Sequence, residues 1–212
     1  FNLRRTARAR LAGVNTPEVF GVDPRKASAG EGQRASAWVV GNVGRLHPDK
    51  DQATLLAGFA KALPNLPEGV LLAIAGSGPL ENSLKTQATN LGIADHVRFL
   101  GQVPNIRRLF SAFDLFVLSS DHEPFGMVLL EAMAAGAPVL ATDCGGAPEV
   151  VADAEKLFPL RDASALAGKL TAFFSITRTA GEDLTRVKHH FSDASARHRF
   201  FSLPMVQAIL TK

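Results

Sequence analysis

The chain of 212 residues contains a single cysteine, Cys144, so it cannot form an intramolecular disulfide. A reducing compartment is therefore compatible with the sequence, and we expect a cytoplasmic protein. No apolar run reaches the roughly 18 residues of a transmembrane helix, and the first residues lack the apolar segment of a signal peptide. The 23 Lys and Arg nearly balance the 20 Asp and Glu, which argues against a nucleic-acid partner.

Hydrophobic residues make up 46% of the chain, which excludes an intrinsically disordered protein. From residue 36 onward, short apolar runs alternate with helical patterns. The runs predict strands at residues 37–43, 70–75, 97–100, 114–118, 138–141 and, weakly, 156–159. Helices are predicted at residues 51–62, 79–91, 105–112, 126–135, 146–152 and 163–175. This alternation predicts an α/β fold with a doubly wound parallel sheet that is covered on both faces.

Two flanking segments differ from this central domain of residues 36–176. Residues 1–35 predict a short basic helix followed by a linker. Residues 177–212 contain no strand pattern and predict two C-terminal helices. Because the chain opens on Phe rather than Met, we expect it to be part of a longer protein.

Ligands of open α/β sheets bind at the carboxyl ends of the strands. The loop after the first strand offers Gly44, Arg45 and Lys50, whose two cations suit a phosphorylated ligand but could equally face solvent. The loop after the second strand, from Gly76 to Pro79, begins like a dinucleotide-binding loop without its third glycine. It therefore indicates a tight turn into a helix that leaves room for a ligand.

The loop after the fourth strand carries the strongest signal. Glu123 precedes an apolar helix and Glu131 lies within it, roughly 12 Å further along if the whole segment were helical. Two such carboxylates could bracket a ligand as long as a nucleotide sugar. The apolar surroundings predict a buried helix and a buried Glu131, which would need a partner. The helix N-terminus around residues 125–128 suits a phosphate, and Gly126 would let the backbone approach it.

Other chemistries fit the same loops less well. Ser120, Asp121 and His122 are triad residue types, but neighbours in sequence do not form a triad, and no G-x-S-x-G motif is present. Asp121, His122 and Glu123 could bind a metal, but the histidine spacing of the HExxH motif is missing. We therefore expect neither a hydrolase nor a metal site. Cys144 is interpreted as an inert thiol.

Several motifs together resemble the retaining glycosyltransferases of family 4, over residues 36–152. They are GRL with Lys50 at 44–50, AGSGP at 75–79, FLGQVP at 99–104, EPFG to Glu131 at 123–131, the small-residue tail that follows it, and GG-x-x-E at 145–149. The resemblance implies a GT-B fold, in which two Rossmann-like domains face each other across a cleft. This chain would be the C-terminal, donor-binding domain, with its final helix packed on an N-terminal domain.

The resemblance also implies roles for individual residues. Arg45 and Lys50 match the contacts to the donor diphosphate, and together with Glu123 they form the predicted catalytic set. Glu123 matches the acid that faces the transferred sugar, and Glu131 matches the acid that binds the ribose hydroxyls. The predicted binding set is completed by Gly44, Gly76, Val103 near the base, and Pro124, Phe125, Gly126, Met127 and Val128.

The implied function is metal-independent transfer of a sugar from a UDP-, GDP- or ADP-linked donor, with no further cofactor. The implied acceptor is a glycan or glycolipid, as in lipopolysaccharide synthesis, and the basic residues 1–12 allow a peripheral membrane contact. Without an N-terminal domain we expect the chain alone to be inactive. Two alternatives stay open, a non-catalytic nucleotide-binding module and a related sugar-nucleotide epimerase.

Overall fold

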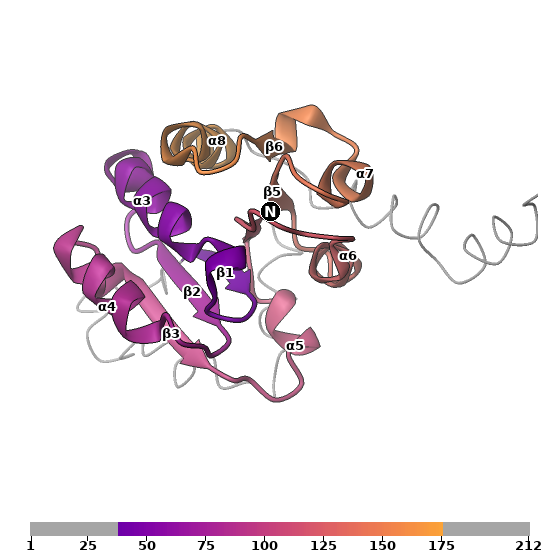
Figure 1. Cartoon of the computed structure of the whole chain (residues 1–212). Coiled ribbons are helices and arrows are strands. Elements are labelled where there is room, and N and C mark those ends of the chain that lie inside the picture. The colour runs from indigo at the N-terminus through magenta and orange to yellow at the C-terminus, as the bar shows by residue number, and fades with distance from the viewer. Residues whose placement is uncertain (1–37, 176–212) are drawn as a thin grey trace, which may run out of the picture.

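The computed structural model describes residues 38–175, which form one six-stranded sheet between two layers of helices (Figure 1). All strand pairs are parallel, and the spatial order is β3-β2-β1-β4-β5-β6. The strands are β1 (Val39–Val43), β2 (Leu71–Ala75), β3 (Val97–Gly101), β4 (Leu115–Leu118), β5 (Val139–Thr142) and β6 (Leu157–Phe158).

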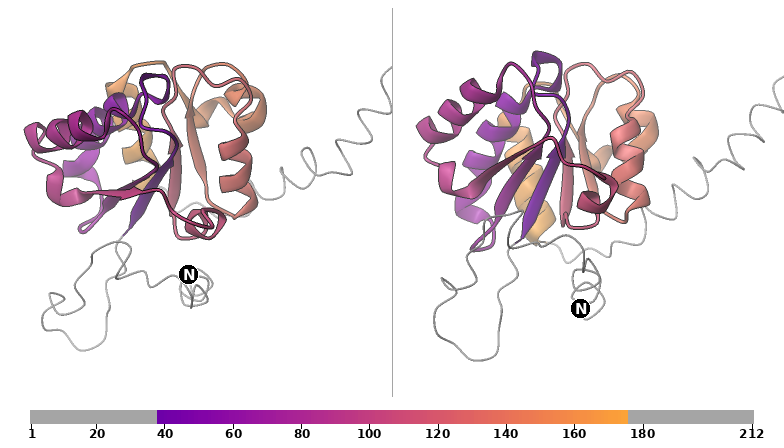
Figure 2. Two further views of the ribbon diagram at one scale, coloured as in Figure 1. Left: turned by 60° about the horizontal axis from the view of Figure 1, so that its bottom comes forward. Right: turned by 90° about the horizontal axis from the view of Figure 1, so that it is seen from below.

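Between residues 38 and 175, six α-helices connect or follow the strands, three on each face of the sheet (Figure 2). On one face lie α3 (Gln52–Ala62), α4 (Glu81–Asn90) and α8 (Ala163–Ser175). On the other lie α5 (Arg107–Phe110), α6 (Met127–Ala134) and α7 (Ala147–Val151). Short 3-10 turns occupy η1 (Pro48–Lys50), η2 (Leu63–Asn65), η3 (Ala94–His96) and η4 (Ala154–Lys156).

The sheet divides the hydrophobic core into two halves. On β1, Val39 faces the layer of α5, α6 and α7, whereas Val40 faces the layer of α3, α4 and α8. Because each strand needs apolar side chains on both faces, its sequence is an unbroken apolar run. Helix α8 approaches α3 closely at Gly58, where a Cβ atom would lie 2.7 Å from Leu166 Cδ2.

The structure confirms the predicted parallel α/β sheet and each predicted strand and helix within the described residues. The predicted helix 105–112 is reduced to the four residues of α5. The weakly predicted strand 156–159 is the two-residue β6. The predictions for residues 1–35 and 177–212 lie outside the described residues.

The strand order reverses between β1 and β4, whose neighbours lie on opposite sides. The loops that leave these two strands, residues 44–50 and 119–126, therefore flank the point where open α/β sheets bind ligands. This carboxyl edge faces the viewer in Figure 1. None of the helices between residues 38 and 175 is long and apolar enough to cross a membrane.

Candidate functional site

The loop after β1 is fixed by backbone hydrogen bonds to the loop after β2. The N–H of Gly44 donates to the carbonyl of Ala75 and that of Leu46 to the carbonyl of Ser77, both at 3.0 Å. Gly76 has φ +134°, and a Cβ atom there would lie 1.9 Å from the carbonyl oxygen of Gly44. Gly76 is therefore needed for this close backbone contact, and its predicted contact with a ligand stays a prediction.

The loop after β1 also contacts the loop after β4, across the switch point. The hydroxyl of Ser119 donates to the carbonyl of Lys50 at 2.9 Å. The N–H of Asp121 donates to the carbonyl of Asp49 at 3.0 Å. These bonds hold together the segment that carries Lys50 and the segment that carries Glu123.

Lys50 and Glu123 form an ion pair, with 2.7 Å between Nζ and Oε2. The Glu123 side chain is only 10% exposed and that of Lys50 is 21% exposed. The carboxylate also accepts hydrogen bonds from the N–H of Gly126 at 3.1 Å and the hydroxyl of Ser120 at 3.4 Å. The structure thus brings two predicted catalytic residues into direct contact, although 73 positions separate them in the sequence.

The loop after β5 completes the backbone around Glu123. The N–H of Gly146 donates to the Glu123 carbonyl at 2.9 Å. A Cβ atom on Gly145, which has φ +52°, would lie 2.0 Å from the same carbonyl oxygen. The GG pair is therefore a packing requirement of the site, which the sequence showed only as part of a motif.

Helix α6 differs from the buried helix predicted from its apolar sequence. Only Leu129, Ala132 and Met133 of its eight residues are buried, because the helix packs on the sheet with one side. Glu131 is half-buried rather than buried, so that prediction was wrong. Among residues 38–175 its carboxylate has no hydrogen-bonding or ionic partner.

The start of α6 is open to solvent. Gly126 is the N-cap and has φ +89°, so the helix begins at Met127 and the segment from Glu123 to Gly126 is not helical. The side chains of Phe125 and Met127 are exposed, at 46% and 59%, while Pro124 is exposed and Val128 is half-buried. The helical estimate of the spacing between the two acids therefore does not hold, because only part of that segment is helix.

The remaining predicted residues lie at the same edge but outside the Lys50–Glu123 contact. The Arg45 side chain is exposed, and its carbonyl accepts a hydrogen bond from Gln52 Nε2 at 2.9 Å. Val103 follows β3 at one end of the sheet and packs against the core beneath α5, α6 and α7. Whether Arg45 and Val103 contact a ligand stays a prediction.

One contact at this edge was missed from the sequence. Arg161, in the loop after β6, places Nη2 at 2.6 Å from Oδ2 of Asp121. The hydrogen bond and the negative charge of Asp121 raise the pKa of Arg161 above its usual value, so the guanidinium is always charged. The signal that could have found it is an arginine after the last strand, since that loop opens on the same edge.

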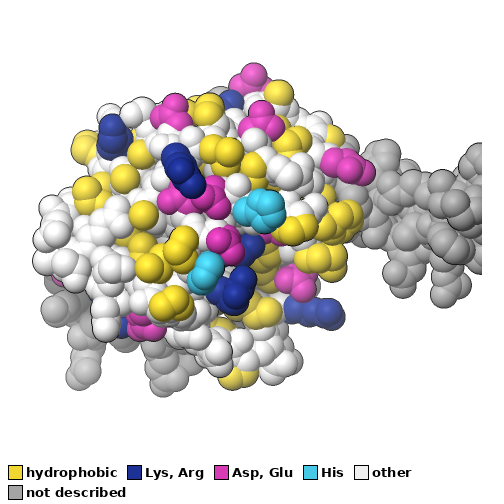
Figure 3. Space-filling view, in the orientation of Figure 1, with side chains coloured by type: hydrophobic (Ala, Val, Ile, Leu, Met, Phe, Trp, Pro, Cys, Tyr) yellow, Lys and Arg dark blue, Asp and Glu magenta, His cyan; other side chains and the backbone are white. Residues whose placement is uncertain are grey.

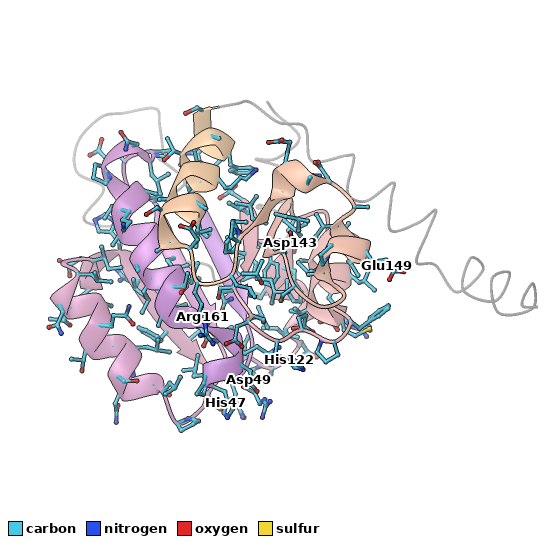
Figure 4. The ribbon with its side chains drawn as sticks, turned by 45° about the horizontal axis from the view of Figure 1, so that its top comes forward. His47, Asp49, His122, Asp143, Glu149 and Arg161 are labelled. Carbon is cyan, nitrogen blue, oxygen red and sulfur yellow. The ribbon has the colours of Figure 1, made fainter. Side chains whose placement is uncertain are left out.

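Charged and histidine side chains gather in the middle of the carboxyl edge (Figure 3). Figure 4 shows Arg161, His122, Asp49 and His47 together there, with Asp143 and Glu149 nearer α7. His47 Nδ1 lies 3.1 Å from Asp49 Oδ2. Within the described part of the chain, no group of three or more His, Cys, Asp or Glu is placed to hold a metal ion.

The family model "Glycosyl transferases group 1" matches residues 25–185. The chain belongs to this family. Among curated relatives, the lipopolysaccharide core biosynthesis glycosyltransferase LpsE of Rhizobium meliloti is 40% identical over 121 residues, covering 57% of this chain and 34% of LpsE. The chain spans between about a third and a half of the first curated relatives that it matches.

Solved structures share the fold. Anabaena HepE in complex with UDP is 30% identical, with a TM-score of 0.65 over 84% of this chain and 48% of HepE. The C-terminal domain of a group 1 glycosyltransferase, LpcC of Francisella tularensis, is 23% identical, with a TM-score of 0.67 over 74% of this chain and 87% of that domain. The described residues thus have the Rossmann-like fold expected for one half of a GT-B glycosyltransferase.

Proposed function

We propose that this chain is the donor-binding half of a retaining, metal-independent glycosyltransferase that uses a nucleoside-diphosphate sugar. The observation that carries the proposal is the Lys50–Glu123 ion pair at the switch point of the sheet, beside the N-terminus of α6. The similarity to HepE, which was solved with UDP and is 30% identical, supports a nucleotide ligand.

The leaving group of such a reaction is a nucleoside diphosphate, on which negative charge develops. Lys50 and the exposed Arg45 would offer it positive charge from the loop after β1. The N-terminus of α6 adds the free N–H groups of its first turn and the positive end of the helix dipole, which suit a phosphate. These groups stabilise the developing charge without a metal ion.

The two acids would bind opposite ends of the donor. Glu123 is held by Lys50 and by the N–H of Gly126, and its carboxylate would face the transferred sugar. Glu131 has a half-exposed carboxylate without a partner among the described residues, and such a group suits the paired hydroxyls of a ribose. The acceptor would bind between this half and an N-terminal domain.

We further propose that the acceptor is a glycan or glycolipid of a bacterial cell surface. Support comes from the relatives, because LpsE is named for lipopolysaccharide core biosynthesis. Epimerisation of a nucleotide sugar is the competing outcome, and it would give free epimer instead of a glycosylated acceptor.

The direct test of donor binding is calorimetric titration of the chain with UDP, GDP and ADP in the presence of EDTA. We expect one of these nucleotides to bind, and Glu131→Ala to weaken it by about tenfold or more, since hydrogen bonds to a charged group contribute about 1.5–3 kcal/mol. Glu81→Ala, which changes a glutamate at the start of α4, is the matched control and should bind normally. Preferential binding of NAD, or unchanged affinity in Glu131→Ala, would overturn the proposal.

Transfer must be measured in the full-length protein. We expect activity to persist in EDTA, the anomeric configuration of the donor to be kept in the product, and Glu123→Gln to abolish turnover. NMR of the anomeric proton distinguishes retention from inversion. An inverted product, or activity that returns only with added divalent metal, would contradict the corresponding part of the proposal.

A further inference from the structure

Arg161 has an unusual backbone conformation for its residue type. Its φ is +56°, in the left-handed region that residues with a Cβ atom adopt only at a free-energy cost. Glycine would take this conformation freely. A long side chain in such a position therefore suggests a role for that side chain at this place.

The side chain spans two loops that are not neighbours in the sheet. Arg161 follows β6 and its partner Asp121 follows β4, so β5 lies between the two strands. The Asp121 side chain is 21% exposed and that of Arg161 is 73% exposed. Because Arg161 is so exposed, its ion pair with Asp121 contributes little to the free energy of unfolding. Stability therefore does not explain why an arginine occupies this strained position.

Asp121 is the point at which three loops meet. Its carboxylate binds Arg161, and its N–H donates to the carbonyl of Asp49 at 3.0 Å. Asp49 precedes Lys50, and Asp121 lies two positions before Glu123. The Arg161–Asp121 contact thus links the loop after β6 to both members of the Lys50–Glu123 pair.

Other anchors hold the backbone of the loop after β4, but none of them holds the Asp121 carboxylate. The carbonyl of Ser120 accepts hydrogen bonds from Thr142 and Cys144, and the carbonyl of Glu123 accepts one from Gly146. Between these anchors, Arg161 is the only partner of the Asp121 carboxylate among residues 38–175.

We propose that Arg161 is a positioning residue, whose guanidinium clamps Asp121 and so fixes Lys50 and Glu123 for the donor. Its role in turnover rests on the proposed function, whereas its effect on the loop does not. The strained backbone is retained because glycine, which would relieve the strain, has no side chain to reach Asp121.

Amide hydrogen exchange of the chain without any ligand tests the clamp. In Arg161→Gly we expect the amides of Asp121 and Gly126, which bond Asp49 and Glu123, to exchange about fivefold faster or more. Amides of the central strands should be unchanged, and the Tm should stay the same or rise by up to about 3 °C as the strain is relieved. Asp121→Asn should accelerate the same two amides without changing the backbone at Arg161.

Lys85→Gln is the matched control, because the Lys85–Glu81 pair has the same 2.6 Å separation but lies on α4. It should leave the amides of Asp121 and Gly126 at their wild-type rates. Wild-type rates in Arg161→Gly would overturn the proposal. So would a Tm loss above about 5 °C with faster exchange throughout the sheet, because Arg161 would then support the whole fold.

Kinetics of the full-length protein test the effect on the reaction. We expect Arg161→Gly to lower kcat by about tenfold, as small misplacements of catalytic groups do, with nucleoside-diphosphate affinity within about twofold of wild type. Arg161→Lys keeps the charge and should recover part of the lost kcat. Unchanged kcat in Arg161→Gly would overturn the positioning role. If the wild type binds no nucleotide, the proposed function is overturned, but the hydrogen-exchange result is unaffected.

Discussion

Replacing Lys50 with methionine removes the positive charge beside Glu123 while keeping a side chain of similar shape. The Glu123 carboxylate is 10% exposed, so it would stay largely shielded from water without its counter-charge. Because the two charged groups are only 2.7 Å apart, we expect this change to lower the free energy of unfolding substantially.

The size of the effect follows from the geometry. Two charges 2.7 Å apart attract by about 6 kcal/mol at an effective dielectric constant of about 20, an attraction that offsets the cost of desolvating both groups. Removing one member of a fully buried pair costs about 3–5 kcal/mol. Because the carboxylate keeps the N–H of Gly126 and the hydroxyl of Ser120, we expect Lys50→Met to lose about 2–3 kcal/mol.

Urea unfolding of Lys50→Met, Glu123→Gln and the double variant measures this coupling. In thermal unfolding, we expect the single Lys50→Met change to lower the Tm by about 5–10 °C. The double variant should be more stable than the sum of the single losses predicts, by about 1–3 kcal/mol. Additive losses, or a loss below about 0.5 kcal/mol in Lys50→Met, would show that the two side chains do not interact as the structure has them.

Four further changes test local packing and capping in the fold by urea unfolding. Gly145→Ala should lose about 2–4 kcal/mol because its Cβ atom would overlap the Glu123 carbonyl, whereas Gly136→Ala, with φ +80° and open space around it, should lose only about 1 kcal/mol. Phe59→Ala should lose about 3–5 kcal/mol, since Phe59 is fully buried between α3 and the sheet, and a smaller loss would contradict that packing. Asp162→Ala should lose about 1 kcal/mol because Asp162 Oδ1 caps the first turn of α8, and no loss would mean that the cap is unimportant.

The sheet was predictable because its strands are buried on both faces. An apolar run ends where its strand ends, because the backbone of the following loop is exposed to solvent. The run at residues 70–75, for example, corresponds to β2, which spans Leu71–Ala75. Strand β6 gave a weak signal because it pairs over only two residues, beside β5.

The site was predictable in part, because topology alone brings the loops after β1 and β4 together. This rule placed Lys50 and Glu123 near each other, but an ion pair between residues 73 positions apart depends on side-chain geometry that no local pattern encodes. The Arg161–Asp121 contact was missed for a related reason. The loop with Arg161 follows the shortest strand, whose weak apolar pattern gave no clear strand end at which to predict a ligand-binding loop.

The prediction of a buried Glu131 failed because an apolar sequence does not show what covers it. Helix α6 packs on the sheet through Leu129, Ala132 and Met133, and its other side is left partly exposed. Apolar residues on that other side, such as Met127 and Ala134, made the whole helix look like a core element.

The Lys50–Glu123 pair also explains how a charged site persists in a stable fold before a ligand arrives. A shielded carboxylate destabilises a protein unless a cation or hydrogen-bond donors compensate it. Here Lys50 and the N–H of Gly126 provide that compensation. A bound diphosphate would compete with Glu123 for the same lysine, so binding would require Lys50 to be shared between the carboxylate and the ligand.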